Sequence, residues 1–166
     1  MRKKARLQSI LLLLSFSLET AAKISFDGIT CQSDVRKELL GRHMLNEKVM
    51  VTERKYKDIG LKGLGGFGLQ EDPYFVIWWE VCGREYVLLE TQNIVRDVLA
   101  SPLTDSAYSF QIATCTSDDK ELEEVVITYS VKPTPRGIYR PEFAWGINEK
   151  TLKFFKITKG EVVCKQ

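Results

Sequence analysis

The four cysteines are the residues with the clearest chemistry in this sequence. They stand at Cys31, Cys82, Cys115 and Cys164, and no two of them form a CxxC pair. The only histidine, His43, is separated from them in the sequence, so a zinc site is not indicated. An even number of cysteines in an exported chain indicates two disulfides, with three possible pairings. We favour Cys31–Cys164 and Cys82–Cys115, because a cysteine as close to the end as Cys164 needs a distant partner.

The first residues have the pattern of a secretory signal peptide. A basic segment at residues 2–6 precedes an apolar run at residues 10–14, and small residues end at Ala22. The alternatives are a membrane anchor and an ordinary helix, but the apolar run is too short to span a bilayer. We therefore predict a signal peptide at residues 1–22 and one secreted domain at residues 23–166, with no stable membrane association after cleavage.

Cleavage would change the charge of the protein. The whole chain has 24 basic and 22 acidic residues. Removing residues 1–22 takes away four basic residues and one acidic residue, which leaves 20 and 21 and a formal charge of −1. The mature domain would lack the overall positive charge that drives non-specific binding to nucleic acid.

Residues 58–72 form a glycine-rich run, DIGLKGLGGFGLQED. Such a run can bind phosphate when it connects a strand to a helix. This one leads into Pro73 and another strand, and it lacks the GK[ST] ending of a phosphate-binding loop. We interpret it as a mobile surface loop.

The elements around these residues are one helix and then a series of strands. Apolar residues at helical spacing predict a helix over about residues 34–46, with Ser33 as its N-cap. Aromatic and β-branched runs predict strands at residues 49–56, 74–81, 84–91, 106–115 and 122–131 and in the tail from residue 139. Residues 93–100 fit either a helix or a strand, and residues 132–141 are predicted to be a loop. This order predicts an α+β fold, with the helix packed on one face of a mostly antiparallel sheet.

The strand at residues 106–115 alternates cleanly between apolar and polar side chains, which fall on opposite faces of a strand. Its alternation predicts two sets: Tyr108, Phe110 and Ile112 toward the core, and Ser109, Gln111 and Ala113 on the floor of a shallow groove.

Three segments resemble the small fungal extracellular guanyl-preferring ribonucleases and their ribotoxin relatives. They are Cys31 followed by Ser33-Asp34-Val35 at the helix start, the strand at residues 107–112, and the tail from Asn148 to Cys164. The resemblance implies a curved sheet with the helix packed on it, and a last cysteine bridged to the first.

The catalytic residues of that family are not matched. Its glutamate position falls on Ser109, its arginine position falls near Ala144 with Arg140 close by, and its histidine position falls on Thr158 or Lys159. Cleavage of RNA by this mechanism needs a general base, a general acid and a cation on the phosphate. The resemblance therefore implies a ribonuclease-like scaffold that is not an enzyme.

An exported, catalytically inactive scaffold of this kind resembles the ribonuclease-like secreted effectors of cereal powdery mildews. The implied function is suppression of host defence by binding host proteins, immune receptors among them, or RNA, after translocation into host cells. The protein would be a monomer without a cofactor or metal. Many of these effectors have an aromatic residue two positions before the early cysteine, where this chain has Ile29.

Two alternatives remain open. One is an active ribonuclease or ribotoxin that uses Arg140, Glu142 and Lys159. The other is an unrelated disulfide-stapled binding module whose exposed aromatic residues, between residues 61 and 79, form a site, although Trp78 and Trp79 at such spacing are more often core residues. The residues of the candidate groove are Ser109, Gln111, Arg140, Glu142, Thr158 and Lys159.

Overall fold

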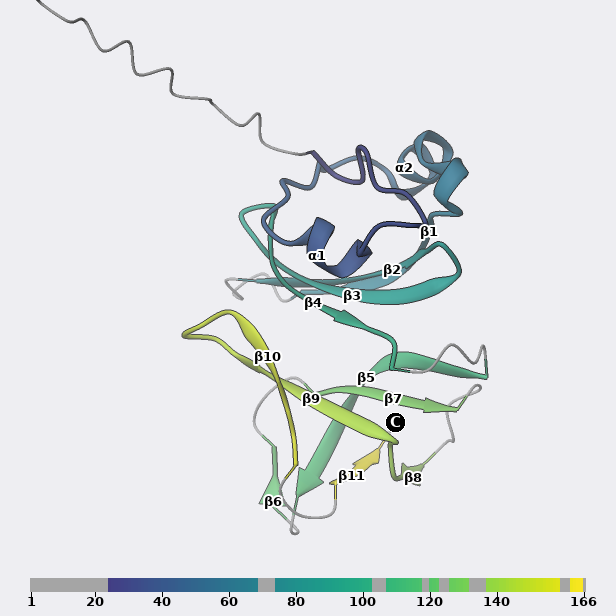
Figure 1. The fold of residues 1–166 in the computed structure, drawn as a ribbon. Coiled ribbons are helices and arrows are strands. Elements are labelled where there is room, and N and C mark those ends of the chain that lie inside the picture. Colours follow the sequence, from purple (N-terminus) through teal and green to yellow (C-terminus); the bar gives the residue numbers. More distant parts are fainter. Residues whose placement is uncertain are drawn as a thin grey trace, which may run out of the picture.

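The computed structural model describes residues 24–68, 74–102, 107–117, 120–122, 126–131, 137–158 and 162–165. The predicted signal peptide at residues 1–22 and the candidate site residue Lys159 lie outside these residues. The described chain forms three layers, which Figure 1 shows from the helices through a first sheet to a second sheet.

The first sheet is a four-stranded antiparallel meander in the order β1-β2-β3-β4. Its strands are β1 (Lys62–Phe67), β2 (Phe75–Val81), β3 (Arg84–Thr91) and β4 (Ile94–Ala100). Two-residue turns with positive φ, Cys82-Gly83 and Gln92-Asn93, connect β2 to β3 and β3 to β4. Positive φ at both central residues is the geometry that suits the twist of a hairpin. The predicted strands at 74–81 and 84–91 and the Cys82-Gly83 turn are confirmed, and the ambiguous segment at 93–100 forms the strand β4 from Ile94.

The second sheet is also antiparallel, in the order β10-β9-β7-β5-β11-β8, with β6 paired to β5. Its strands are β5 (Tyr108–Ser117), β6 (Lys120–Glu121), β7 (Val126–Val131), β8 (Ile138–Tyr139), β9 (Phe143–Asn148), β10 (Lys153–Lys156) and β11 (Val162–Lys165). The strands predicted at 106–115, at 122–131 and in the tail therefore exist, with shifted ends.

The helical layer differs most from the sequence prediction. Helix α1 (Val35–Leu39) is one turn long, and the chain turns away at Gly41, whose φ is +75°. Its N-cap is Asp34, which accepts a hydrogen bond from the Lys37 amide, rather than the predicted Ser33. Residues 49–56, predicted as a strand, hold helix α2 (Val49–Lys55), and a 3₁₀ turn, η1 (Lys57–Ile59), follows it.

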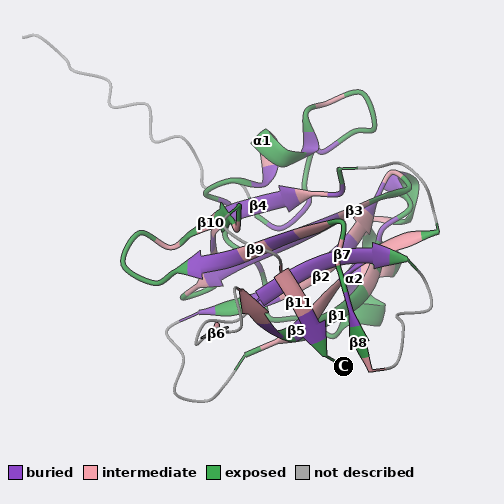
Figure 2. Cartoon of the chain, turned by 90° about the horizontal axis from the view of Figure 1, so that it is seen from below, coloured by how far each residue is buried: buried purple, intermediate pink, exposed green. Residues whose placement is uncertain are grey.

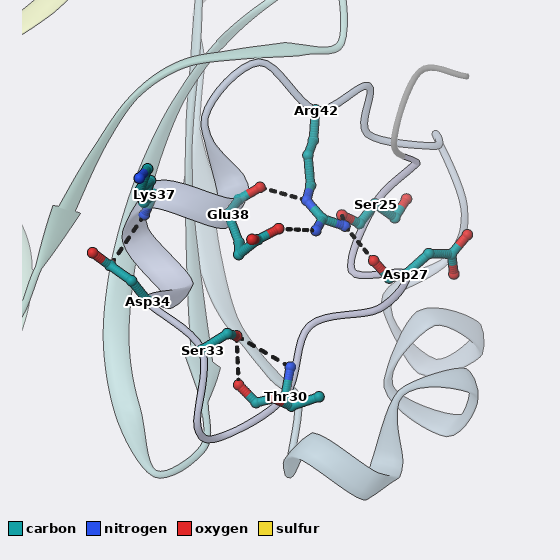
Figure 3. Close-up of polar contacts among 8 residues, drawn as sticks. All are labelled: Ser25, Asp27, Thr30, Ser33, Asp34, Lys37, Glu38 and Arg42. Atoms are coloured by element: carbon teal, nitrogen blue, oxygen red, sulfur yellow. Dashed lines mark hydrogen bonds and ion pairs between the residues drawn. The ribbon is translucent and has the colours of Figure 1, made fainter. Parts of the chain in front are cut away.

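Arg42 connects the pieces of this layer in place of a longer helix. Its side chain is 2% exposed and donates to the carbonyl oxygens of Ser25, Asp27 and Glu38 and to the Glu38 carboxylate (Figure 3). A buried guanidinium needs such partners, because an unpaired buried charge is costly. The N-terminal segment is thereby fastened to α1.

Two apolar cores hold the three layers together. Phe26, Leu39, Trp79 and Leu88 are among the residues that fill the space between the helices and the first sheet. The space between the two sheets is filled by residues of both, including Val76, Leu89, Phe110, Ile127 and Tyr129. Figure 2 shows the resulting burial along β3, β7 and β9. As predicted, β2 contributes side chains to cores on both of its faces.

The two disulfides are Cys31–Cys82 and Cys115–Cys164. The first attaches the segment before α1 to the β2–β3 turn, and the second joins directly opposed residues of β5 and β11. The predicted pairing of Cys31 with Cys164 and of Cys82 with Cys115 is therefore wrong. Each bridge lies within one sequential half of the described chain, so no disulfide ties the two ends together.

The predicted α+β class is also wrong. The chain is mostly antiparallel β, with two packed sheets and only two short α-helices in its described part. The physical reason is that Gly41 ends the one predicted long helix and that the strands divide between two sheets, which bury their apolar faces against each other. A single curved sheet under one helix is not formed.

Candidate functional site

A hollow of about 400 Å³ opens at one rim of the core between the sheets. We call it the inter-sheet hollow; its lining residues are Leu64, Gly65, Trp78, Glu85, Ser109, Phe110, Gln111 and Ile112. They come from β1, β2 and β3 of the first sheet and from β5 of the second. The hollow therefore depends on the packing of the two sheets.

The local structure of β1 shapes the wall of the inter-sheet hollow. The pairing with β2 shifts between Gly63 and Gly65, so Leu64 is an extra residue in a β-bulge. Gly65 has a φ of +141°, a conformation that side chains disfavour and glycine adopts freely. A bulge redirects the side chain that it contains, and Leu64 is 45% exposed.

Polar groups line the inter-sheet hollow beside its apolar rings. Glu85 accepts a hydrogen bond from the Phe110 amide through Oε2, at 3.1 Å. Gln111 donates through Nε2 to Ser130 Oγ, at 3.0 Å. Two enclosed atoms, Trp78 Nε1 and Gln111 Oε1, have no hydrogen-bond partner within the described residues. An enclosed polar atom without a partner costs about 1–3 kcal/mol, so a molecule that satisfied one would gain that energy.

A second, more apolar hollow of about 570 Å³ lies on the other side of Leu64. We call it the β1 hollow; it is lined by Val49, Gly63, Leu64, Gly65, Gly66, Phe75, Ile77, Trp78 and Trp79. Leu64, Gly65 and Trp78 belong to both hollows, so the two adjoin at these residues. Phe75, at 51% exposed, adds an aromatic ring to this surface.

The six candidate groove residues do not form one site. Ser109 and Gln111 line the inter-sheet hollow. Arg140 and Glu142 line a different hollow of about 230 Å³, which they share with Lys156 and which has no lining residue in common with the first.

Thr158 and Lys159 are the two remaining candidates. Thr158 is exposed at the end of the segment after β10, and Lys159 lies outside the described residues. Of the strand predicted to form the groove floor, Ser109 and Gln111 border a hollow together with Phe110 and Ile112, which were predicted for the core, whereas Ala113 is buried beside Cys115 and Cys164.

His43 and the cysteines offer no further site. His43 is exposed and makes isolated β-bridges with Ile24 and Ile94. All four cysteines are in disulfides. Within the described ranges, no group of three or more His, Cys, Asp or Glu side chains could hold a metal ion.

The composition of the inter-sheet hollow was only partly visible in the sequence. Aromatic residues between 61 and 79 were considered for a site of an unrelated binding module, and one of them, Trp78, lines this hollow. Leu64 and Glu85 were missed, because neither stands in a recognisable motif. The glycines around Leu64 were the available signal, since glycine inside a strand is typical of a bulge.

Comparison of the chain with protein-family models, with curated proteins and with solved structures gave no match.

Proposed function

We propose that this protein is a secreted, disulfide-stapled binding protein that holds a segment of a partner protein in the inter-sheet hollow. The observation that carries the proposal is the combination of apolar side chains with enclosed polar atoms that lack partners in the described part of the chain. Binding sites are typically concave, mostly apolar and supplied with a few polar groups that fix orientation. Leu64 and Trp78 provide the apolar part, and the lining residues Trp78 and Gln111 each carry an enclosed polar atom, Nε1 and Oε1, that has no partner within the described residues.

Secretion is supported by two independent features. Disulfides form and persist in oxidising compartments, and this chain has two. The first 22 residues have the signal-peptide pattern described above. No helix in the described residues is long and apolar enough to cross a membrane.

Binding rather than catalysis is proposed because the carboxylate in the inter-sheet hollow already has a structural task. Glu85 holds the Phe110 amide and so joins β3 to β5. The ribonuclease-like effector role remains a prediction, but the single curved sheet and the Cys31–Cys164 bridge on which it depended are replaced by two sheets and two separate bridges.

A displayed library of random twelve-residue peptides, selected on the oxidised protein, tests the proposal. We expect enriched peptides to bind the wild-type protein and to bind Leu64→Glu about tenfold more weakly, because the glutamate puts a charge into the apolar wall. Ile138→Glu is the matched control, because Ile138 is 76% exposed and lines none of the three hollows. Enriched peptides that bind both variants as well as they bind the wild-type protein would contradict the proposal, as would a selection that yields none.

A further inference from the structure

The first half of β5 has one edge that no described strand covers. β7 pairs with Tyr108–Ala113 along one edge of β5. On the opposite edge, β11 pairs with β5 only from Thr114 to Ser117. Among the described residues, the second sheet therefore has a gap beside residues 108–113, in line with β11.

The backbone of β5 presents hydrogen-bonding groups to this gap. In an extended strand, the amide and carbonyl groups of alternate residues point to the same edge. The Phe110 amide is bonded to Glu85 of the first sheet, so it points away from β7. Gln111 points the other way, since its carbonyl oxygen accepts from Thr128 Oγ1 of β7 at 3.5 Å. The Ile112 amide and the carbonyl oxygens of Phe110 and Ile112 therefore face the gap.

The gap and the inter-sheet hollow are the same place. Ser109, Phe110, Gln111 and Ile112 line the hollow along the uncovered edge, and Leu64 and Trp78 lie across from them. An added strand would put alternate side chains on opposite faces, so the side chain opposite Phe110 would lie on the face of Phe110, toward the inter-sheet core. Its neighbours would lie on the face of Gln111, where Gln111 Oε1 has no partner among the residues that the structure describes.

We infer that the occupant of the inter-sheet hollow is an extended segment of a partner protein, which adds to the second sheet as a strand beside residues 109–112 of β5. This inference rests on the proposed function and specifies its mode. Strand addition uses backbone hydrogen bonds for affinity and a side-chain pocket for specificity. A second copy of the chain is a poorer fit, because its own β5 edge is bordered by β1 and β2 in the same way, and a whole domain needs more room beside Leu64 and Trp78 than one strand does. A single extended segment can enter.

A synthetic peptide with the β7 sequence, Val126–Val131, between terminal lysines is the probe. This sequence already pairs with the same residues of β5 on their other edge, so its alternation of side chains is compatible with β5. The comparison peptide has the same sequence with alternate amides N-methylated, which removes donors on one edge without changing the side chains. Either edge of the peptide could face β5. Two comparison peptides are therefore made, one methylated at the odd-numbered positions and one at the even-numbered positions.

We expect the unmodified peptide to bind and to slow hydrogen exchange at the Ile112 amide. Methylation in one phase should weaken binding about tenfold or more, since it removes at least two backbone hydrogen bonds. Ile112→Pro, which removes a donor at an edge position where proline is tolerated, should weaken binding by a similar factor, while Ile138→Glu should not. Non-reducing peptide mapping and thermal melting confirm that each variant folds.

The outcomes separate the inference from the proposed function. Equal binding of all the methylated peptides, failure of the β7 peptide to bind, or slowed exchange away from β5 would overturn the strand-addition inference. If library peptides nevertheless bind and lose affinity with Leu64→Glu, the proposed function stands without it. If neither the library nor the β7 peptide gives binding, both are wrong.

Discussion

Glu90 places a carboxyl group on the face of β3 that packs under the helices. Tyr86 and Leu88, at alternate positions of the strand, belong to that core. Glu90 is 4% exposed, and its Oε1 has no hydrogen-bond partner within the described residues. Burial raises the pKa of Glu90 from 4.5 to about 7, because desolvation disfavours the charged form.

This pKa makes stability depend on pH in a defined direction. A carboxyl group with a raised pKa in the folded state contributes stability below its unfolded pKa and loses it as the pH rises through the folded value. We expect the Glu90 contribution to the free energy of unfolding to fall by roughly 2–3 kcal/mol between pH 5 and pH 8. Glu90→Gln cannot ionise and should remove this fall. The free energy of unfolding of the variant, relative to that of the wild-type protein, should therefore be higher at pH 8 than at pH 5.

Urea unfolding with the disulfides intact measures this difference. Glu47→Gln is the control, because Glu47 is exposed and its substitution should leave the pH dependence of the wild-type protein in place. If the free energies of unfolding of wild type and Glu90→Gln changed with pH in parallel, the Glu90 carboxyl would ionise equally in the folded and unfolded states, which would contradict the prediction.

The pattern of side chains along one strand predicts which of them share a face, but it does not predict which distant strands will lie beside it. Ser109 and Gln111 border a hollow, but so do Phe110 and Ile112, which the alternation assigns to the core, because residues of both faces of β5 meet along its edge. Arg140 and Glu142 were grouped with them by a resemblance, yet they line another hollow, because that grouping depended on how distant strands assemble.

At the scale of elements, β1 and α2 depend on each other. Gly63 lies under Val49 of α2, and a methyl group added at Gly63 would overlap Val49 Cγ1. Glu53 of α2 also accepts a hydrogen bond from the Gly63 amide at 2.8 Å. The absence of a side chain at Gly63 is therefore what lets α2 approach the edge strand.

Gly63→Ala should displace α2 and lower the free energy of unfolding by about 1–3 kcal/mol, as overpacking typically does. Val49→Ala should cost little alone, because Val49 is exposed, and it should relieve most of the loss when the two are combined. The double-mutant cycle would then show a favourable coupling between the two substitutions. If the two single effects simply added, the loss in Gly63→Ala would come from the backbone conformation at Gly63 and not from overlap with Val49.

The same two elements show the limits of local sequence patterns. Strands rich in aromatic and β-branched residues, such as β2 and β3, were predicted well because their own composition favours a strand. The glycine-rich run was predicted to be a loop, yet β1 forms in it because β2 supplies the hydrogen-bond partners. The predicted helix at 34–46 ends early because Gly41 adopts a positive φ and Arg42 turns back to the N-terminal segment.

At the scale of the whole molecule, the two disulfides stabilise different halves. Their sequence separations are 51 and 49 residues, so the chain-entropy model assigns each about 4 kcal/mol. Replacing Cys31 and Cys82 by alanine should speed hydrogen exchange first in residues 24–48, and replacing Cys115 and Cys164 should speed it first in β11. Both double variants should lose a similar free energy of unfolding.

Exchange measured by mass spectrometry and denaturant midpoints test this division, after non-reducing peptide mapping of the wild-type protein. Joint loss of protection across both halves in either double variant would show one cooperative unit that the bridges do not divide. A mapped peptide that joins Cys31 to Cys164 would contradict the structure itself.

The position of the first bridge also bears on how the native pairing is reached during synthesis. A chain emerges from its N-terminus, so Cys31 and Cys82 are both present before Cys115 has been made. They can therefore be oxidised while they are the only two thiols available, and the later pair, Cys115 and Cys164, then has no competitor. A pairing of the first cysteine with the last would instead have required Cys31 to wait for the whole domain. The order in which the cysteines are synthesised would thus favour the pairing that the structure has.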